Sequence, residues 1–157
     1  MSEEKKIDKR KQGRRNKANG AAWELKVRKD LERLGWKVSK FQNNIDLETK
    51  TMIPARRKYN PFNRAFSVGT GFPDFIAWKE GDVADIETEA FNIDIPSTYS
   101  TIGIEAKSNG SLTKLEKDKC LFLLENNVFS NIFIAKKMKE GRRVVPEYID
   151  FRERYIK

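Results

Sequence analysis

Apolar and polar residues recur along this chain with the periods of helices and strands. The clearest helical stripe consists of Trp23, Val27, Leu31 and Leu34. Because residues three and four apart share one face of a helix, this stripe predicts an amphipathic helix. We expect the helix to begin at Asn16 or Asn19 and to end at Gly35, since Asn is a favoured first cap and Gly a favoured stop.

Shorter apolar or alternating segments predict the strands of a sheet. They are residues 36–41, 72–78, 102–107 and 131–135, with a further edge strand at 144–149. A second helix with a wide apolar face is predicted from about Lys114 to Asn126. We therefore predict one α/β domain over residues 18–157, with a central mixed sheet flanked by helices.

The segment 101–107 carries the residues around which the rest of the chain is arranged. Alternate side chains of a strand point to the same face, so Glu105 and Lys107 should project side by side. The segment 71–78 is a second apolar strand, and it begins with an acid, Asp74. If the two strands pair, two carboxylates and one ammonium group meet at one edge of the sheet. Such side chains can hold a divalent metal beside a phosphate.

The net charge of +9 and the pI of about 9.6 favour a polyanionic partner, most simply nucleic acid. Residues 1–17 hold eight Lys or Arg against three acids, so they supply +5 of this charge. Because they are poor in apolar residues, we expect a flexible basic arm. It would serve either as a solubilising tail or as a phosphate-binding arm, with Arg14, Arg15 and Lys17 as contacts.

Two further segments differ from the rest in composition. Residues 42–70 are expected to form a long loop that interleaves aromatic residues with basic ones, including Arg56, Arg57, Lys58 and Arg64. This loop suits contact with phosphates and bases, and it equally suits a surface loop held to the core by its aromatic residues. Residues 80–100 are acidic but lack the residue order of an EF-hand, so we expect a solvated insertion there rather than a calcium loop.

The residue types that are missing restrict the chemistry. The chain has no His, which excludes Ser–His–Asp triads, His general bases and His–metal sites. Its single Cys, Cys120, excludes an intrachain disulfide and is expected to be a small buried residue. No apolar run is long enough to span a bilayer, and the N-terminus lacks the apolar segment of a signal peptide. We therefore expect a cytoplasmic protein with no membrane partner.

Catalysis would then depend on carboxylates, Lys and a metal ion. Magnesium prefers oxygen ligands, and Asp74, Glu105 and the carbonyl of Ala106 could supply three of them. Lys107 could orient or deprotonate a water and offset negative charge, because a partly buried Lys shifts its pKa. Glu24, from the first helix, could join the metal site or remain an ordinary acid at the helix rim.

In order and context, these residues resemble the PD-(D/E)xK nuclease superfamily. The match consists of Glu24 on a first helix, Pro73-Asp74 on one strand and Glu105-Ala-Lys107 on the next. It covers roughly residues 17–136 and is most similar to archaeal, phage and plasmid Holliday-junction resolvases. Relatives often carry a glutamine where this chain has Glu116 or Lys117.

The resemblance implies a restriction-endonuclease-like core and an intracellular homodimer, encoded by a host or a mobile element, that cuts branched DNA. It implies that Asp74, Glu105 and Glu24 bind Mg²⁺ or Mn²⁺ and that Lys107 is catalytic, with no small-molecule cofactor. Two alternatives remain. One is a sequence-specific nuclease of the restriction or homing type that reads bases through residues 42–70. The other is a non-catalytic nucleic-acid-binding module on the same fold.

Overall fold

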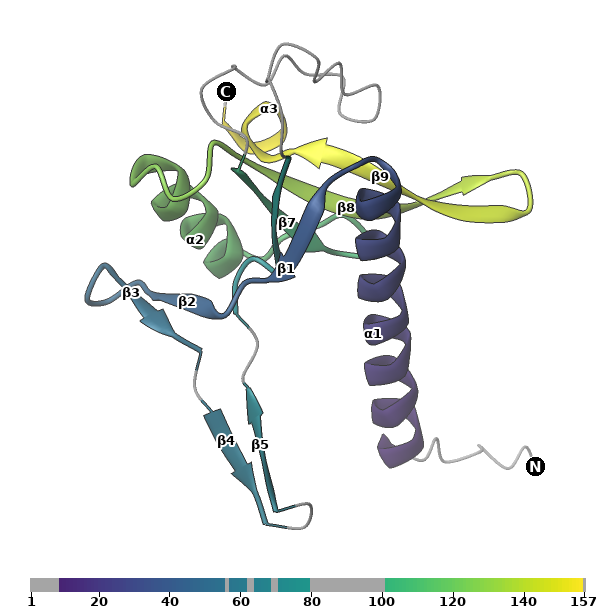
Figure 1. Cartoon of the computed structure of the whole chain (residues 1–157), viewed down its shortest axis with the longest axis horizontal. Coiled ribbons are helices and arrows are strands. Elements are labelled where there is room, and N and C mark those ends of the chain that lie inside the picture. Colours follow the sequence, from purple (N-terminus) through teal and green to yellow (C-terminus); the bar gives the residue numbers. More distant parts are fainter. Residues whose placement is uncertain (1–8, 56, 62–63, 69–70, 80–100, 157) are drawn as a thin grey trace, which may run out of the picture.

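A five-stranded mixed sheet forms the centre of the protein (Figure 1), in a computed structural model that describes residues 9–55, 57–61, 64–68, 71–79 and 101–156. Its strands are β1 (Lys37–Lys40), β6 (Phe75–Trp78), β7 (Thr101–Ala106), β8 (Asn131–Glu140) and β9 (Arg143–Asp150). They lie in the order β1-β6-β7-β8-β9. Strands β7 and β8 are parallel, whereas the other neighbours are antiparallel.

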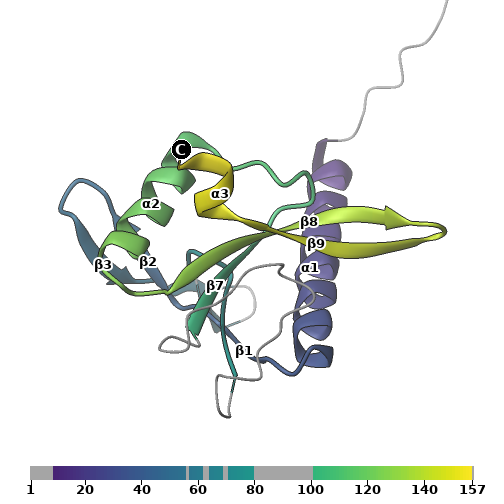
Figure 2. The same ribbon diagram turned by 90° about the horizontal axis from the view of Figure 1, so that it is seen from above.

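Helices cover both faces of this sheet (Figures 1 and 2). They are α1 (Lys9–Arg33), α2 (Lys114–Glu125) and α3 (Phe151–Tyr155). The parallel pair β7 and β8 is joined through α2, as a crossover connection requires. The predicted α/β class, with a mixed sheet between helices, is confirmed.

Two apolar clusters, one on each face, hold the helices to the sheet. The cluster under α1 includes Trp23, Val27, Leu31, Phe75, Ile102 and Ile104. The cluster under α2 and α3 includes Cys120, Leu123, Phe129, Ile132, Ile134 and Phe151. Because side chains alternate along a strand, Phe133 of β8 joins the first cluster while its neighbours Ile132 and Ile134 join the second. Cys120 is fully buried, as expected.

Helix α1 begins at Lys9, so the prediction that Asn16 or Asn19 caps its start is wrong. Its buried residues are Trp23, Val27 and Leu31, all in its C-terminal half. Residues 9–17 of the predicted flexible arm are therefore helical, and residues 1–8 lie outside the described residues. No helix within the described ranges is both long and apolar enough to cross a membrane.

Residues 42–70, predicted as a loop, contain two β-hairpins that project from the sheet (Figure 1). They are formed by β2 (Asn43–Asp46) with β3 (Thr51–Pro54), and by β4 (Arg57–Asn60) with β5 (Ala65–Val68). Each of these strands has four residues, too few for an alternating pattern to stand out in the sequence. The predicted acidic insertion, residues 80–100, lies outside the described residues.

The C-terminal part also differs from the prediction. Strand β8 continues to Glu140, beyond the apolar run that predicted it, and the added residues are mostly exposed. They pair with β9 in one long hairpin, so their backbone groups are satisfied without apolar burial. Helix α3 was not predicted, because five residues are too few for a helical period to be visible.

Gly103 of β7 lies where there is no room for a side chain. A Cβ added there would lie 2.9 Å from Pro73 Cγ, 3.2 Å from Phe129 Cδ2 and 3.3 Å from Ile132 Cγ1. The proline ring and the two packed side chains have little freedom to move away. Because Pro73 immediately precedes Asp74, crowding at Gly103 would also shift the segment that carries this acid.

We expect Gly103→Ala to lower the free energy of unfolding by about 1–3 kcal/mol, the usual cost of overpacking a core. The measurement is urea denaturation followed by circular dichroism. Gly20→Ala is the matched control, because a Cβ added at this exposed position of α1 meets nothing within 4 Å beyond the adjoining turns of its own helix. The control should be neutral or stabilising by up to about 1 kcal/mol. Equal effects of the two substitutions would contradict the crowding at Gly103.

Candidate active site

Two acids face each other where β6 and β7 meet. The antiparallel register pairs Phe75 with Ile104, so the next residues outward, Asp74 and Glu105, lie opposite each other. Asp74 N donates a hydrogen bond to Glu105 Oε2 at 3.1 Å, and Ala106 N donates one to Asp74 Oδ2 at 2.9 Å. The two strands pair, as the prediction required, and the two acids lie together as expected.

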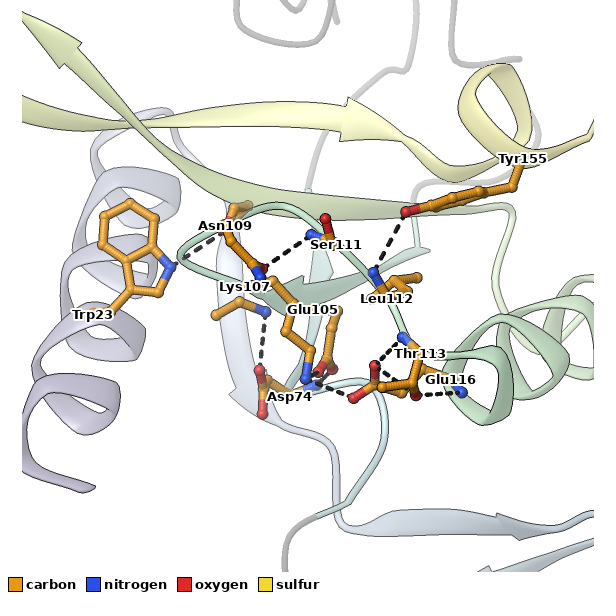
Figure 3. A network of polar contacts seen from close by, with 12 residues as sticks. Trp23, Asp74, Glu105, Lys107, Asn109, Ser111, Leu112, Thr113, Glu116 and Tyr155 are labelled. Carbon is orange, nitrogen blue, oxygen red and sulfur yellow. Dashed lines mark hydrogen bonds and ion pairs between the residues drawn. The ribbon is translucent and has the colours of Figure 1, made fainter. Parts of the chain in front are cut away.

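Lys107 completes the group that the sequence predicted (Figure 3). Its Nζ lies 3.3 Å from Glu105 Oε1 and 2.6 Å from Glu116 Oε1, so the ammonium group is held between two carboxylates. The expectation that Glu105 and Lys107 project side by side is therefore confirmed. Glu105 is only 5% exposed, whereas the Lys107 side chain is 30% exposed.

Glu116 is held in turn by the start of α2. Its Oε2 accepts hydrogen bonds from Thr113 N at 2.8 Å and Thr113 Oγ1 at 3.0 Å. Glu116 N donates to Thr113 Oγ1 at 3.3 Å, which completes a capping box. The helix cap thus fixes the carboxylate that binds Lys107. The spacing Thr113-x-x-Glu116 is a capping-box signature, and this signal could have identified Glu116 in the sequence.

The carbonyl of Ala135 on β8 ties two parts of the site together. It accepts a hydrogen bond from the indole Nε1 of Trp23 at 3.3 Å and another from the backbone N of Lys107 at 3.0 Å. Helix α1 is therefore anchored beside the end of β7. This contact positions Glu24, the residue after Trp23, at the same end of the sheet.

Glu24 forms an ion pair with Lys40, the last residue of β1. The charge of Glu24 raises the pKa of Asp74, so the two acids are close enough to interact. The structure thus brings Glu24 near the predicted site, but its carboxylate is bound to a lysine. No local pattern in the sequence marks Lys40, because its place next to this segment depends on the pairing of β1 with β6, which sets Lys40 opposite Phe75.

Burial is the main cause of the unusual electrostatics of the two central acids. It raises the pKa of Glu105 to about 8, and the charge of Asp74 adds to this effect while Lys107 opposes it. Burial also raises the pKa of Asp74, although the hydrogen bond from the backbone of Ala106 partly offsets it. Both carboxylates would therefore gain from a nearby positive charge.

Lys107 is a cation in this arrangement. Partial burial favours its neutral form, but the hydrogen bond to Glu116 and the charge of Glu105 outweigh it and raise the pKa of Lys107. The pKa of Glu116 shifts in the opposite direction. Burial alone would raise it, but the hydrogen bonds from Lys107 and Thr113 outweigh burial and lower it. Of the two roles predicted for Lys107, orienting a water suits this state better than deprotonating one.

The donor atoms present fit a hard divalent cation such as Mg²⁺ in their chemistry. Asp74 and Glu105 offer carboxylate oxygens, and burial raises the pKa of both groups, so a bound cation would stabilise their ionised forms. Within the described ranges, no three His, Cys, Asp or Glu side chains already converge on a common metal position. Glu24 could complete the set once it leaves Lys40. Ala106 lies at the site, with its N–H bound to Asp74.

The predicted nucleic-acid contacts lie on projecting elements. Arg14, Arg15 and Lys17 are exposed on the N-terminal half of α1. Arg64 is exposed in the β4–β5 hairpin, and Arg57 and Lys58 belong to β4. Arg56 lies outside the described residues. In Figure 1, α1 and the β4–β5 hairpin both extend away from the sheet.

No protein-family model matches this chain, and no significant match was found among curated proteins or solved structures. The resemblance to PD-(D/E)xK nucleases therefore depends on the short motifs and on the geometry described above.

The stability of the metal-free protein should depend on pH through Glu105. A carboxyl group whose pKa is about 8 when folded and 4.5 otherwise keeps its proton longer in the folded state. The contribution of Glu105 to stability is therefore fully present below about pH 4.5 and is lost as the pH rises through about 8. We expect the free energy of unfolding, measured by urea denaturation, to decrease between about pH 5.5 and about pH 8.5.

Glu105→Gln should reduce this decrease, because the amide does not titrate. Part of the decrease should remain, since the pKa of Asp74 is raised in the same direction. An identical pH dependence in both proteins would contradict the buried, proton-binding state of Glu105.

Proposed function

We propose that this chain is a metal-dependent endonuclease that hydrolyses phosphodiester bonds in DNA, built on a restriction-endonuclease-like core. One observation carries the proposal. Asp74 and Glu105, 31 residues apart in sequence, are locked together by hydrogen bonds, with the ammonium group of Lys107 beside them. Phosphodiester hydrolysis needs this combination of carboxylates for a metal and a cation for developing negative charge.

Each residue of the site would have a separate task. Asp74, Glu105 and Glu24 would hold Mg²⁺ or Mn²⁺, which when bound supplies Lewis acidity and an activated water. Lys107 would donate a hydrogen bond to the attacking water or to a phosphate oxygen. Glu116 restrains Lys107 through the 2.6 Å hydrogen bond, so the ammonium group is oriented before the substrate arrives. Burial of Glu105 strengthens these interactions, because water screens them less.

The basic surface supports DNA as the substrate. The chain carries a net charge of +9, and the exposed Arg14, Arg15 and Lys17 extend on a helix beyond the core. Such residues bind phosphates and release counterions. The resemblance to Holliday-junction resolvases supports branched DNA as the preferred substrate. It also supports a cytoplasmic homodimer, in which two sites would cut two strands.

The purified protein should cut DNA in Mg²⁺ and stop when EDTA is added. We expect Asp74→Asn and Lys107→Ala to reduce the cleavage rate by at least about 100-fold, because the first removes a carboxylate that would hold the metal and the second removes a cation that would offset developing negative charge. DNA binding, measured by fluorescence anisotropy, should be kept in both variants. Lys114→Ala is the control, since it removes a charge from the exposed start of α2. Both variants cutting at the wild-type rate would disprove the assignment.

A panel of linear, flapped and four-way DNA should show which substrate the site prefers. We expect faster cleavage of the four-way junction than of linear duplex with the same sequence. Rapid cleavage of one linear sequence would instead support a restriction or homing type of nuclease. Binding to every substrate without metal-dependent cleavage would support the non-catalytic module.

A further inference from the structure

Lys40 stands at the site although no sequence motif includes it. It pairs with Phe75 in the register of β1 and β6, and Phe75 directly follows Asp74. The next residue, Phe41, donates its backbone N–H to the carbonyl of Asp74 at 3.2 Å. This bond fixes the end of β1 to the segment that carries Asp74. The backbone therefore holds Lys40 one residue from the position opposite Asp74.

The ammonium group of Lys40 has two neighbours. It forms the ion pair with Glu24 and lies 4.8 Å from the centroid of the Phe75 ring. Its side chain is 48% exposed, so the pair is open to solvent and accessible to ions. A lysine has a long, flexible stem, so the ammonium group can move while β1 stays in place.

We propose that Lys40 is a substrate-contacting residue that Glu24 holds until a metal binds. A divalent cation that recruits the Glu24 carboxylate to the site releases Lys40, and the freed ammonium group binds the phosphodiester. The inference rests on the proposed nuclease function and extends it. It assigns a second lysine to the site. Glu24 would bind first Lys40 and then the metal ion.

The charges of the described site support this exchange. Four carboxylates, those of Glu24, Asp74, Glu105 and Glu116, share the ammonium groups of Lys40 and Lys107. With Glu105 ionised, which a bound cation favours, the formal sum is −2, and one divalent cation neutralises it. The acids that lack full compensation are the central ones, Asp74 and Glu105, so a cation would bind beside them.

Coulomb attraction then gives the order of events. At equal distance, a doubly charged ion attracts the carboxylate of Glu24 about twice as strongly as the single charge of Lys40 does. The same ion repels Lys40, which loses its counter-ion. A phosphate oxygen of the substrate is the anion that arrives at this position. Lys40 would therefore bind substrate only when the metal is already in place.

The test compares Lys40→Gln with Lys37→Gln, which removes the same charge from the other end of β1, opposite Trp78. Binding of Mg²⁺ is measured by isothermal titration calorimetry on the protein without DNA. Lys40→Gln should bind Mg²⁺ about three- to tenfold more tightly than wild type, because a competing cation is gone. Lys37→Gln should stay within about twofold of wild type, because exposed charges at a distance are screened.

Cleavage should change in the opposite direction. At saturating Mg²⁺, single-turnover cleavage by Lys40→Gln should be at least about tenfold slower, because one phosphate contact is lost. Lys40→Arg keeps the charge and should retain most of the wild-type rate. Lys40→Met takes the place of Lys40→Gln if the latter does not fold.

The outcomes separate the two proposals. Unchanged or weaker Mg²⁺ binding by Lys40→Gln would overturn the role of Lys40, and so would an unchanged cleavage rate at saturating Mg²⁺. If wild type binds Mg²⁺ and cuts DNA, such results leave the nuclease function intact. A wild-type protein that neither binds Mg²⁺ nor cuts DNA would overturn both proposals.

Discussion

The candidate site depends on two hydrogen bonds that cross from β6 to β7 in opposite directions. Asp74 N binds Glu105 Oε2, and Ala106 N binds Asp74 Oδ2, so each acid is held by the backbone beside the other. The register that pairs Phe75 with Ile104 makes this possible. A slip by one residue would move one acid to the opposite face of the sheet and separate the pair.

Burial of these acids costs folding free energy, and the charges around them offset part of that cost. A buried carboxylate loses its hydration and is stable only with hydrogen bonds or opposite charge nearby. Lys107 and the capping box of α2 supply this on one side, and the pair of Glu24 with Lys40 lies on the other. Two apolar residues at these positions would stabilise the sheet without the cost of burying charge. Carboxyl groups whose pKa is shifted by burial and neighbouring charges concentrate at functional sites.

The elements that project from the sheet have a different physical basis from the core. The N-terminal half of α1 buries none of its side chains, because the buried residues of this helix begin at Trp23. Helices without a packed apolar face are only marginally stable on their own. Its exposed arginines and lysines suit contact with an anionic surface, which would neutralise their mutual repulsion. The packed core thus holds the site, whereas the exposed N-terminal half of α1 is suited to contact with an anionic partner.

The sequence by itself determined the parts of the structure that depend on local patterns. The stripe of Trp23, Val27 and Leu31, the apolar strands and the mixed α/β class all follow from spacing along the chain. The positions of Asp74 and Glu105 at strand ends could also be predicted, because acids interrupt apolar runs there. Their meeting was a conditional prediction, since the pairing of the two strands had to be assumed.

Only the tertiary structure decided which charges neutralise which. Glu24 and Lys40 are 16 residues apart, and Lys107 and Glu116 are 9 apart, on different elements in both cases. Many lysines and glutamates in a chain with 35% charged residues have equivalent local surroundings, so no local pattern selects these pairs. The start of α1 and the short hairpins in residues 42–70 were missed for a related reason. Residues 9–22 of α1 are exposed, and each hairpin strand has only four residues, so no hydrophobic period marks them.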